Sequence, residues 1–393
     1  MPVLPDLCYL YPKSAGLKRV IVSVINDLAT DQRVDRTCTT LHEMGYEVLL
    51  VGRKLKHSMP LPEKPYRMHR MRLIFTRGAA FYAEYNFRLF LFLLFRRVDV
   101  LHSNDLDTLA ANYLVSVLRR KPVVYDSHEY FTGVPELEHN PFAKRTWKRI
   151  ESCIVPKLDH CFTVNKSIAG LFREDYGKDF HVMRNVPKRM KETAAVTRKE
   201  LGMPEDKRIL VLQGSGINID RGSEELVRAM ALLDDVYLLY IIGSGDVIPV
   251  LKEMIPALSL QEKVKLTGKL PYAQLLQYTR NADAGITVDK NTNINYRFSL
   301  PNKIFDYIQA GIPVLASDLV EIRRVIETYD VGVMIPEVTP EAIAQGINRM
   351  FADQEAWLRM KANTVRAAAE LNWEEEQKVL VNVYRQIHPD AGR

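Results

Sequence analysis

Short apolar runs alternate along almost the whole chain with longer stretches in which apolar residues recur at helical spacing. The first half of the chain predicts β-strands at residues 19–25, 46–52, 66–73, 98–103, 121–127 and 159–165. The second half predicts strands at residues 208–214, 236–243, 263–268, 282–288, 312–317 and 331–336. Amphipathic helices fill the intervals. Because strands and helices that alternate in this way form parallel sheets covered by helices, the pattern predicts an α/β fold.

A polar stretch, KETAAVTRKELGMPEDK, separates the two sets of strands. We therefore predict two tandem, doubly wound, Rossmann-like domains, residues 1–187 and 188–372. The remaining segment, 373–393, begins with an amphipathic helix over about 373–387, which we expect to cross back to the first domain. Doubly wound folds bind ligands at the carboxyl ends of their strands, so we expect the two domains to face a central cleft.

Charge is spread unevenly along the chain. The 393 residues contain 54 Lys and Arg against 48 Asp and Glu, a net charge of +6. Between Gly52 and Arg97, however, eleven Lys or Arg stand against two acidic residues, Glu63 and Glu84. The small overall excess excludes a dedicated nucleic-acid-binding protein. The local excess favours an anionic partner for the first domain.

The cysteines and the apolar runs bear on the cellular compartment of the protein. The four cysteines, at positions 8, 38, 153 and 161, have no CxxC spacing and no neighbouring histidine cluster, so they predict neither a zinc site nor a disulfide framework. The segment MPVLPDLCYLYPKSAG lacks the pattern of a signal peptide, and the longest apolar run, Leu89–Phe95, is too short to cross a bilayer. We expect a cytoplasmic protein, with the inner face of the membrane as one place where it works.

Two glycine clusters follow predicted strands: GSGINIDRG at 214–222 and GSGD at 243–246. A dinucleotide-binding fingerprint needs a third glycine where Ile219 and Ile248 stand, and the chain contains no GxxxxGK[ST] phosphate loop. The clusters therefore argue against a dehydrogenase and against a P-loop enzyme. Taken singly, each glycine could also serve only to end a strand.

The stretch FSLPNKIFDYIQAGIPVLAS, residues 298–317, predicts a helix from about Leu300 to Ala310, with Ser299 as its cap, that stops at Gly311. Asn302, Lys303 and Asp306 would share one face of it. A helix N-terminus with a lysine binds phosphate, and a carboxylate one turn later can accept hydrogen bonds from a ribose. This spacing predicts a nucleotide site. The alternative is an exposed ion pair between Lys303 and Asp306.

The same stretch resembles the donor-site motif of retaining glycosyltransferases with the GT-B fold, in the group 1 class called glycosyltransferase family 4. Further motifs of that family occur in order along nearly the whole chain: NDLATDQRVDR, HSNDLDTL, VVYDSHEYF, RNVP, QGSGINIDRG, IIGSGD and LTGKLPYAQLLQYTRNADAGI. The resemblance implies a nucleotide-sugar donor such as a UDP- or GDP-sugar, and an acceptor that is a glycan or a lipid-linked saccharide of the cell envelope.

The resemblance also implies roles for individual residues. Arg221 and Lys303 would hold the donor diphosphate and stabilise the charge of the leaving group, His128 would lie close to the reacting sugar, and Asp306 would bind the ribose. Other donor-binding positions would be Gly214, Gly216, Gly243, Gly245, Lys269, Leu270, Ser299, Leu300, Pro301 and Asn302. Acceptor-binding positions would be Asp27, Asp31, Arg33 and Asp105.

The chain departs from the family pattern at three places, one of which is Asp306, a residue one methylene shorter than the usual glutamate. Phe298 stands where the first glutamate of the donor-site signature is expected, and Asn26-Asp27 replace a glycine pair after the first strand. The resemblance implies a reaction that retains the anomeric configuration, in which the departing diphosphate helps to deprotonate the acceptor. It needs no metal or cofactor, because Arg221, Lys303 and a helix dipole take the place of a metal ion. Two alternatives are a catalytically silent sugar-nucleotide-binding protein and a sugar-nucleotide 2-epimerase.

A helix predicted over about Ala80–Arg97 is apolar on nearly all sides, which is typical of a helix buried between a sheet and its neighbours. The basic residues on and before this helix exceed what solubility requires, and such residues attract anionic lipid. We therefore hypothesise that the first domain faces an anionic membrane or an anionic, lipid-linked acceptor.

Overall fold

The computed structural model describes residues 17–29, 31–138, 140–190 and 196–389. Its strands are β1 (Arg19–Ser23), β2 (Glu47–Lys54), β3 (Arg67–Arg72), β4 (Val100–Asn104), β5 (Val123–Ser127), β6 (His160–Thr163), β7 (His181–Val182), β8 (Arg208–Gly214), β9 (Tyr237–Gly243), β10 (Val264–Gly268), β11 (Ala284–Thr287), β12 (Val314–Ser317) and β13 (Gly332–Ile335). Residues 1–16, which we predict not to be a signal peptide, lie outside the described residues, and so does Cys8.

The helices between the strands vary widely in length. They are α1 (Gln32–Glu43), α2 (Gly78–Phe95), α3 (Leu106–Arg119), α4 (Pro135–Glu138), α5 (Pro141–Ile154), α6 (Lys166–Tyr176), α7 (Ser223–Met230), α8 (Ile248–Ala257), α9 (Tyr272–Arg280), α10 (Ile294–Arg297), α11 (Asn302–Ala310), α12 (Val320–Tyr329), α13 (Pro340–Ala352), α14 (Gln354–Glu370) and α15 (Trp373–Ile387), with 3₁₀ turns η1 (Phe131–Gly133) and η2 (Val155–Lys157).

The strands form two sheets. Their hydrogen-bonded orders are β3-β2-β1-β4-β5-β6-β7 and β10-β9-β8-β11-β12-β13. The recorded pairings, from β1 with β2 to β12 with β13, are parallel. This confirms the predicted α/β fold with two Rossmann-like sheets. Each predicted strand is present, and β7 is a short strand that the apolar pattern did not predict.

The chain divides into two compact units. The first comprises the described residues up to Tyr125 and those from Val381 onward, and the second runs from Asp126 to Leu380. In the first unit, the end of α15 packs on the sheet: the Tyr384 ring lies 5.5 Å from that of Tyr46, and its hydroxyl is 2.9 Å from Nδ1 of His102. The predicted domain boundaries at 187 and 372 stay a prediction.

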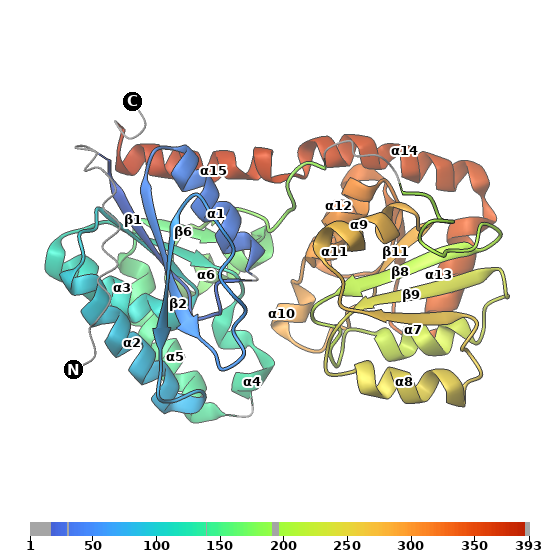
Figure 1. Ribbon diagram of the computed structural model, residues 1–393, viewed down its shortest axis with the longest axis horizontal. Helices are drawn as coiled ribbons and strands as arrows, with labels where there is room; N and C mark the ends of the chain where they lie inside the picture. Colours follow the sequence, from blue (N-terminus) through green and yellow to red (C-terminus); the bar gives the residue numbers. More distant parts are fainter. Residues whose placement is uncertain (1–16, 30, 139, 191–195, 390–393) are drawn as a thin grey trace, which may run out of the picture. The chain divides into compact units, whose positions relative to one another are not determined.

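The six-stranded sheet lies between two layers of helices (Figure 1), with α7, α8 and α13 on one face and α9, α11 and α12 on the other. Alternate residues of β8 explain this arrangement. Leu210 and Leu212 belong to the core under the first layer, while Ile209 and Val211 belong to the core under the second. A strand with apolar side chains on both faces is buried on both faces, so helices must cover each of them.

Helix α11 starts two residues later than predicted. Pro301 occupies the N-cap position without a side-chain hydrogen bond, and the predicted Ser299 cap is wrong because that hydroxyl donates to Asp289 instead. The predicted stop at Gly311 is confirmed. This glycine has φ of +79°, a left-handed conformation that terminates helices and favours glycine.

Helix α2 is buried along one face and exposed along the other. Its buried residues are Phe81, Tyr85, Leu89 and Leu93, and its exposed large apolar residues are Phe87, Leu91 and Phe95. The interpretation of α2 as an entirely buried helix is therefore wrong. Within the described ranges, no helix combines the length and the apolar character that a bilayer crossing requires.

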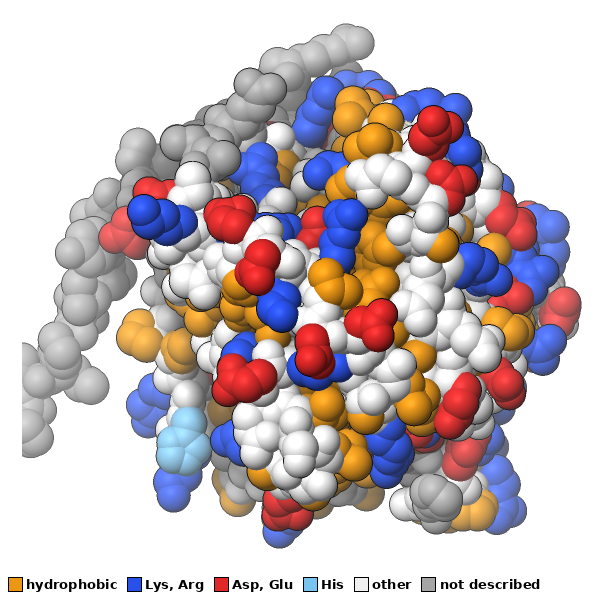
Figure 2. Space-filling view, turned by 90° about the vertical axis from the view of Figure 1, so that its right-hand side faces the viewer, with side chains coloured by type: hydrophobic (Ala, Val, Ile, Leu, Met, Phe, Trp, Pro, Cys, Tyr) orange, Lys and Arg blue, Asp and Glu red, His pale blue; other side chains and the backbone are white. Residues whose placement is uncertain are grey.

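On the face shown in Figure 2, the described acidic and basic side chains are interspersed around a band of hydrophobic ones.

Candidate functional site

The candidate site is built on the carboxyl ends of three adjacent strands, β9, β8 and β11. Gly214 at the end of β8 is in register with Gly243 at the end of β9. Asp289 follows β11 directly after Val288. Because parallel strands end at the same edge of a sheet, the loops that follow them lie together, and ligands of such sheets bind there.

The two glycine loops at this edge pack against each other, backbone on backbone. The amide of Ser244 donates to the carbonyl of Gly214 at 3.1 Å. A Cβ atom on Gly243, where φ is +150°, would lie 1.7 Å from that same carbonyl oxygen, and one on Gly245 would lie 1.9 Å from the carbonyl of Ile217. Both positions therefore require glycine for close packing. Gly216 is more open, since its nearest atom to such a Cβ would be 3.9 Å away.

Arg221, just before α7, forms an ion pair with Asp289. Its Nη1 lies 2.7 Å from Oδ2 of Asp289, whose side chain is fully buried, and its guanidinium lies 4.3 Å from the ring centre of Tyr296. Ser299 donates to the same carboxylate oxygen at 3.2 Å. Within the described chain, Oδ1 of Asp289 is buried without a hydrogen-bond partner. Burial opposes the charge of Arg221, but Asp289 and Tyr296 outweigh it and raise the pKa of the guanidinium.

Lys303, in the first turn of α11, is the second cation of this cluster. Burial lowers the pKa of its ammonium group, Asp289 opposes that shift, and Arg221 adds to it. Its Cε would lie 3.9 Å from a Cβ on Gly214, so lysine and glycine loop are neighbours. Among the residues that the structure describes, Lys303 makes no ion pair with Asp306 or with another acid. The interpretation of the two as a simple ion pair is therefore wrong.

Asp306, one turn after Lys303, accepts hydrogen bonds from two neighbouring side chains of the described chain. The Tyr272 hydroxyl donates to Oδ1 at 2.7 Å, and Nε2 of Gln213 donates to Oδ2 at 3.0 Å. Gln213 is itself buried at the end of β8, and its Oε1 accepts a hydrogen bond from Thr279 at 2.6 Å. The carboxylate is thus fixed in orientation by groups on β8 and α9, which prepares it to accept further hydrogen bonds from a ligand hydroxyl.

The other predicted donor-binding residues differ in how exposed they are. Lys269, directly after β10, and Asn302, at the start of α11, are exposed. Leu270 and Leu300 are partly buried and pack on the core under α11 and α12. The structure therefore brings Arg221, Lys303, Ser299 and the glycine loops together, while the two leucines serve packing.

His128 comes directly after β5, in the same compact unit as the donor-site residues. Its Nε2 lies 3.4 Å from Oδ2 of the buried Asp126. The residues on either side of it are joined: Ser127 donates through its hydroxyl to the carbonyl of Glu129 at 2.7 Å. The role of His128 near a reacting sugar stays a prediction.

The predicted acceptor residues belong to the first unit. Asp27 forms an ion pair with Arg70, and Asp31 caps α1 by accepting a hydrogen bond from the amide of Val34 at 3.1 Å. Arg33 is buried. Asp105 occupies the N-cap position of α3 with φ of +58°. Two of the four thus have clear structural duties, and acceptor binding by this group stays a prediction.

Sequence reasoning missed Asp289, Tyr296, Gln213 and Tyr272. Asp289 carried a usable signal, because it is an acid placed directly after a buried strand of a parallel sheet. The other three are recognisable only from their contacts. In the described chain, no group of three or more His, Cys, Asp or Glu side chains could hold a metal ion. Metal independence of the reaction stays a prediction.

Comparison with known proteins gives two family matches. A model described as Glycosyltransferase Family 4 matches residues 31–186, and one described as Glycosyl transferases group 1 matches residues 195–367. The uncharacterized glycosyltransferase MJ1607 of Methanocaldococcus jannaschii is 24% identical over 199 residues, which are 50% of this chain and 49% of that protein. This chain spans about half the length of the curated relatives it matches.

Solved structures match over almost the whole chain. Sucrose-phosphate synthase from Thermosynechococcus elongatus has a TM-score of 0.75 at 16% identity, and covers 95% of this chain and 99% of its own. Anabaena Alr3699/HepE in complex with UDP has a TM-score of 0.72 at 14% identity, and covers 94% of this chain and 100% of its own. At these identities, the likeness establishes a shared fold.

Proposed function

The chain belongs to the glycosyltransferases of group 1 and family 4, and from this premise we propose that it transfers a sugar from a nucleotide-sugar donor to an acceptor. One observation carries the proposal: two cations, Arg221 and Lys303, lie about one buried carboxylate at the strand ends, with Asp306 one helical turn beyond. This arrangement offers a nucleotide what it needs, namely positive charge for two phosphates and an acceptor for a ribose.

The donor diphosphate would lie between Arg221, Lys303 and the first amides of α11. Free N–H groups at a helix N-terminus favour an anion, and here Lys303 adds a full charge at the same end. A bound diphosphate would share Arg221 with Asp289, and would favour the charged form of Lys303, which burial disfavours. The UDP bound by the Anabaena structure, which has the same fold, supports a nucleoside diphosphate as the donor's leaving group.

In the proposed reaction, the bond between the anomeric carbon and the diphosphate oxygen breaks, and a bond from that carbon to an acceptor oxygen forms on the same face. The acceptor proton passes to the departing diphosphate. The anomeric configuration is thereby retained. Arg221 and Lys303 stabilise the negative charge that develops on the diphosphate, a contribution of about 3 kcal/mol for each preorganised donor. His128 acts at the sugar end of the same complex.

The testing experiment follows release of nucleoside diphosphate from UDP-, GDP- and ADP-sugars, with NMR assignment of the product's anomeric configuration. We expect one donor to be turned over, and Arg221→Ala and Lys303→Ala each to lower the rate by on the order of a hundredfold. Lys252→Ala, which changes an exposed lysine of α8, is the matched control and should leave the rate unchanged. Binding without turnover would favour the catalytically silent protein, and a released 2-epimer would favour the epimerase.

For the acceptor side, we propose that α2 and α3 face an anionic membrane that carries a lipid-linked acceptor, with the protein at the cytoplasmic surface. Phe87, Leu91 and Phe95 recur every four residues, which aligns them on one exposed stripe of α2. On α3, which packs beside α2, Leu114, Val117 and Leu118 are also exposed. Exposed apolar side chains gathered on two neighbouring helices are typical of an interaction surface.

The charges around this apolar stripe fit an anionic bilayer. Arg88, Arg96 and Arg97 are exposed on α2 or directly after it, and Arg120 is exposed at the end of α3. Each basic residue near an anionic membrane contributes about 1 kcal/mol, and the aromatic side chains can enter the interface. This combination supports peripheral binding.

A further inference from the structure

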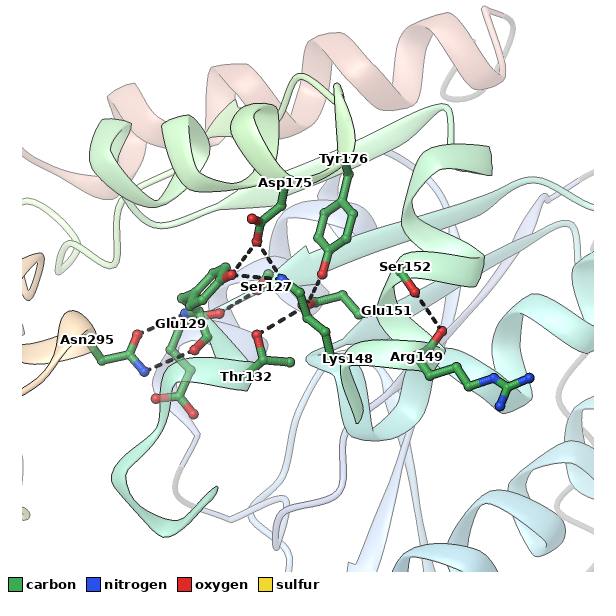
Figure 3. Close-up of polar contacts among 11 residues, drawn as sticks. Ser127, Glu129, Thr132, Lys148, Arg149, Glu151, Ser152, Asp175, Tyr176 and Asn295 are labelled. Carbon is green, nitrogen blue, oxygen red and sulfur yellow. Dashed lines mark hydrogen bonds and ion pairs between the residues drawn. The ribbon is translucent and has the colours of Figure 1, made fainter. Parts of the chain in front are cut away.

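A segment that carries His128 is joined to the donor-site loop by one asparagine. The amide of Tyr130 donates to Oδ1 of Asn295 at 3.0 Å, and Nδ2 of Asn295 donates to the carbonyl of Tyr130 at 3.0 Å. Figure 3 shows Asn295 reaching from α10 toward the segment that contains Ser127 and Glu129. This reciprocal pair satisfies both backbone groups of Tyr130, so a single side chain fixes the position of the segment relative to α10.

Close packing reinforces this junction. Gly133, at the end of η1, lies so near α10 that a Cβ atom on it would be 2.4 Å from Cγ2 of Ile294 and 2.8 Å from Cδ1 of Tyr130. Cγ2 is attached directly to the branched Cβ of isoleucine, so it can move away only by a rotation about χ1, which is restricted in β-branched residues. A larger residue at 133 would therefore push the segment and α10 apart.

A polar network holds the other side of the same segment (Figure 3). Lys148 of α5 donates to Tyr130 Oη at 3.0 Å and to Asp175 of α6 at 2.6 Å, and Tyr130 itself donates to Asp175. Beside it, Thr132 donates to the fully buried Glu151 at 3.3 Å. Because side chains of α5 and α6 bind Tyr130 and Thr132, we expect the segment to be well ordered and not a mobile loop.

The junction leads directly to the cation cluster. Asn295 is followed by Tyr296, whose ring lies 4.3 Å from the guanidinium of Arg221. On the other side of the junction, His128 is two residues before Tyr130. Asn295 thus sets the position of the His128 segment relative to Arg221. In the proposed function, Arg221 holds the donor diphosphate.

We propose that Asn295 is a positioning residue: it docks the backbone of Tyr130 on α10 and so fixes the distance between His128 and the Arg221 cluster during sugar transfer. This inference rests on the proposed function for its kinetic consequence, but the docking itself does not. Loss of the docking should lower kcat and leave nucleotide affinity unchanged, since Arg221 keeps Asp289 and Lys303 is not touched. Misplacement of about 1 Å between reacting groups can lower a rate by roughly a hundredfold.

The first test measures hydrogen exchange of the backbone amides of residues 128–134. In Asn295→Ala and in Gly133→Ala, we expect the Tyr130 amide to exchange at least about tenfold faster than in the wild type, because its hydrogen-bond acceptor, Oδ1 of Asn295, is lost or displaced. Two variants are matched controls. Gly170→Ala adds a Cβ in open space, and Asn363→Ala removes an asparagine that donates at 3.0 and 3.1 Å to Asp330. Unchanged exchange in both test variants would overturn the proposal.

The second test measures kcat and the donor KM with the nucleotide sugar that the wild type turns over. We expect Asn295→Ala and Gly133→Ala each to lower kcat by about 10- to 100-fold with KM within about twofold. The double variant should be no worse than about threefold below the more impaired single variant, because both changes break one junction. Full kcat in both single variants would refute the positioning role while leaving the proposed function intact. A wild type inactive on every donor would refute the proposed function, and the exchange test would still judge the docking.

Discussion

Removal of Arg221 should cost more folding stability than neutralisation of its partner, Asp289. The asymmetry follows from burial: the Asp289 side chain is 0% exposed, whereas that of Arg221 is 30% exposed. In Arg221→Ala, the carboxylate stays buried and keeps the hydrogen bond from the Ser299 hydroxyl and the nearby charge of Lys303, but loses its ion pair. In Asp289→Asn, the amide oxygen can still accept from Arg221, and the guanidinium can reach water.

The magnitudes follow from these two situations. Breaking a buried ion pair so that one charge remains costs about 3–5 kcal/mol, and the Ser299 donor places Arg221→Ala near the lower limit, at about 3 kcal/mol. Exchange of a charged acceptor for a neutral one should cost Asp289→Asn about 1 kcal/mol. In the double variant Arg221→Ala/Asp289→Asn, the buried group that has lost its guanidinium is no longer charged, so about 1–2 kcal/mol should be recovered relative to Arg221→Ala.

Thermal unfolding followed by circular dichroism measures these differences. At roughly 2 °C per kcal/mol for a large chain, the midpoint should fall by about 6 °C in Arg221→Ala and by about 2 °C in Asp289→Asn, with partial recovery in the double variant. Equal midpoints in the two single variants, or a double variant less stable than both, would show that the pair does not carry a buried charge as described.

Four further outcomes are expected. Asp306→Ala should weaken UDP or GDP binding by about 1–3 kcal/mol in calorimetry, and unchanged affinity would remove its ribose role. Burial lowers the pKa of Lys303, so the wild type should bind UDP more tightly than Lys303→Met at low pH, and this difference in affinity should shrink as the pH rises. The decrease should begin below pH 10.5, the ordinary pKa of lysine, and a constant difference up to that pH would contradict the lowered pKa. His128→Ala should depress turnover and spare nucleotide binding, so a loss of binding alone would reassign it. Sedimentation with anionic vesicles should depend on low salt and decline in Phe87→Ser/Phe95→Ser, whereas binding to neither anionic nor neutral vesicles would leave a soluble acceptor.

Much of the fold could be predicted from the apolar pattern, because strands buried on both faces of a parallel sheet have continuous apolar sequences. The run at 208–214 matches β8 residue for residue. Strand β7 has two residues, His181 and Val182, and exists because they pair with Phe162 and Thr163. A segment so short has no periodicity of its own, so its structure comes from the neighbouring strand and not from its sequence.

The candidate site was predictable where a residue acts through its local position, and not where a distant contact decides. Lys303 and Asp306 are three residues apart on one helix, which the sequence displays directly. Ser299 was expected to cap that helix, but its hydroxyl bonds Asp289, ten residues earlier. Asn295 and Tyr130 are 165 positions apart, and neither local sequence contains a sign of the other.

Calorimetric titration of the wild type and of Lys303→Met with UDP, GDP and ADP tests the central claim most directly, because it asks whether the Arg221 and Lys303 cluster binds a nucleoside diphosphate. We predict that at least one of the three binds the wild type, and that Lys303→Met weakens that binding by about 10- to 100-fold, the effect of one charge-assisted contact to phosphate. Lys252→Met, at an exposed position of α8, should bind as the wild type does. If none of the three nucleotides bound at millimolar concentration, or if both lysine variants bound equally well, the cluster would not be a donor site.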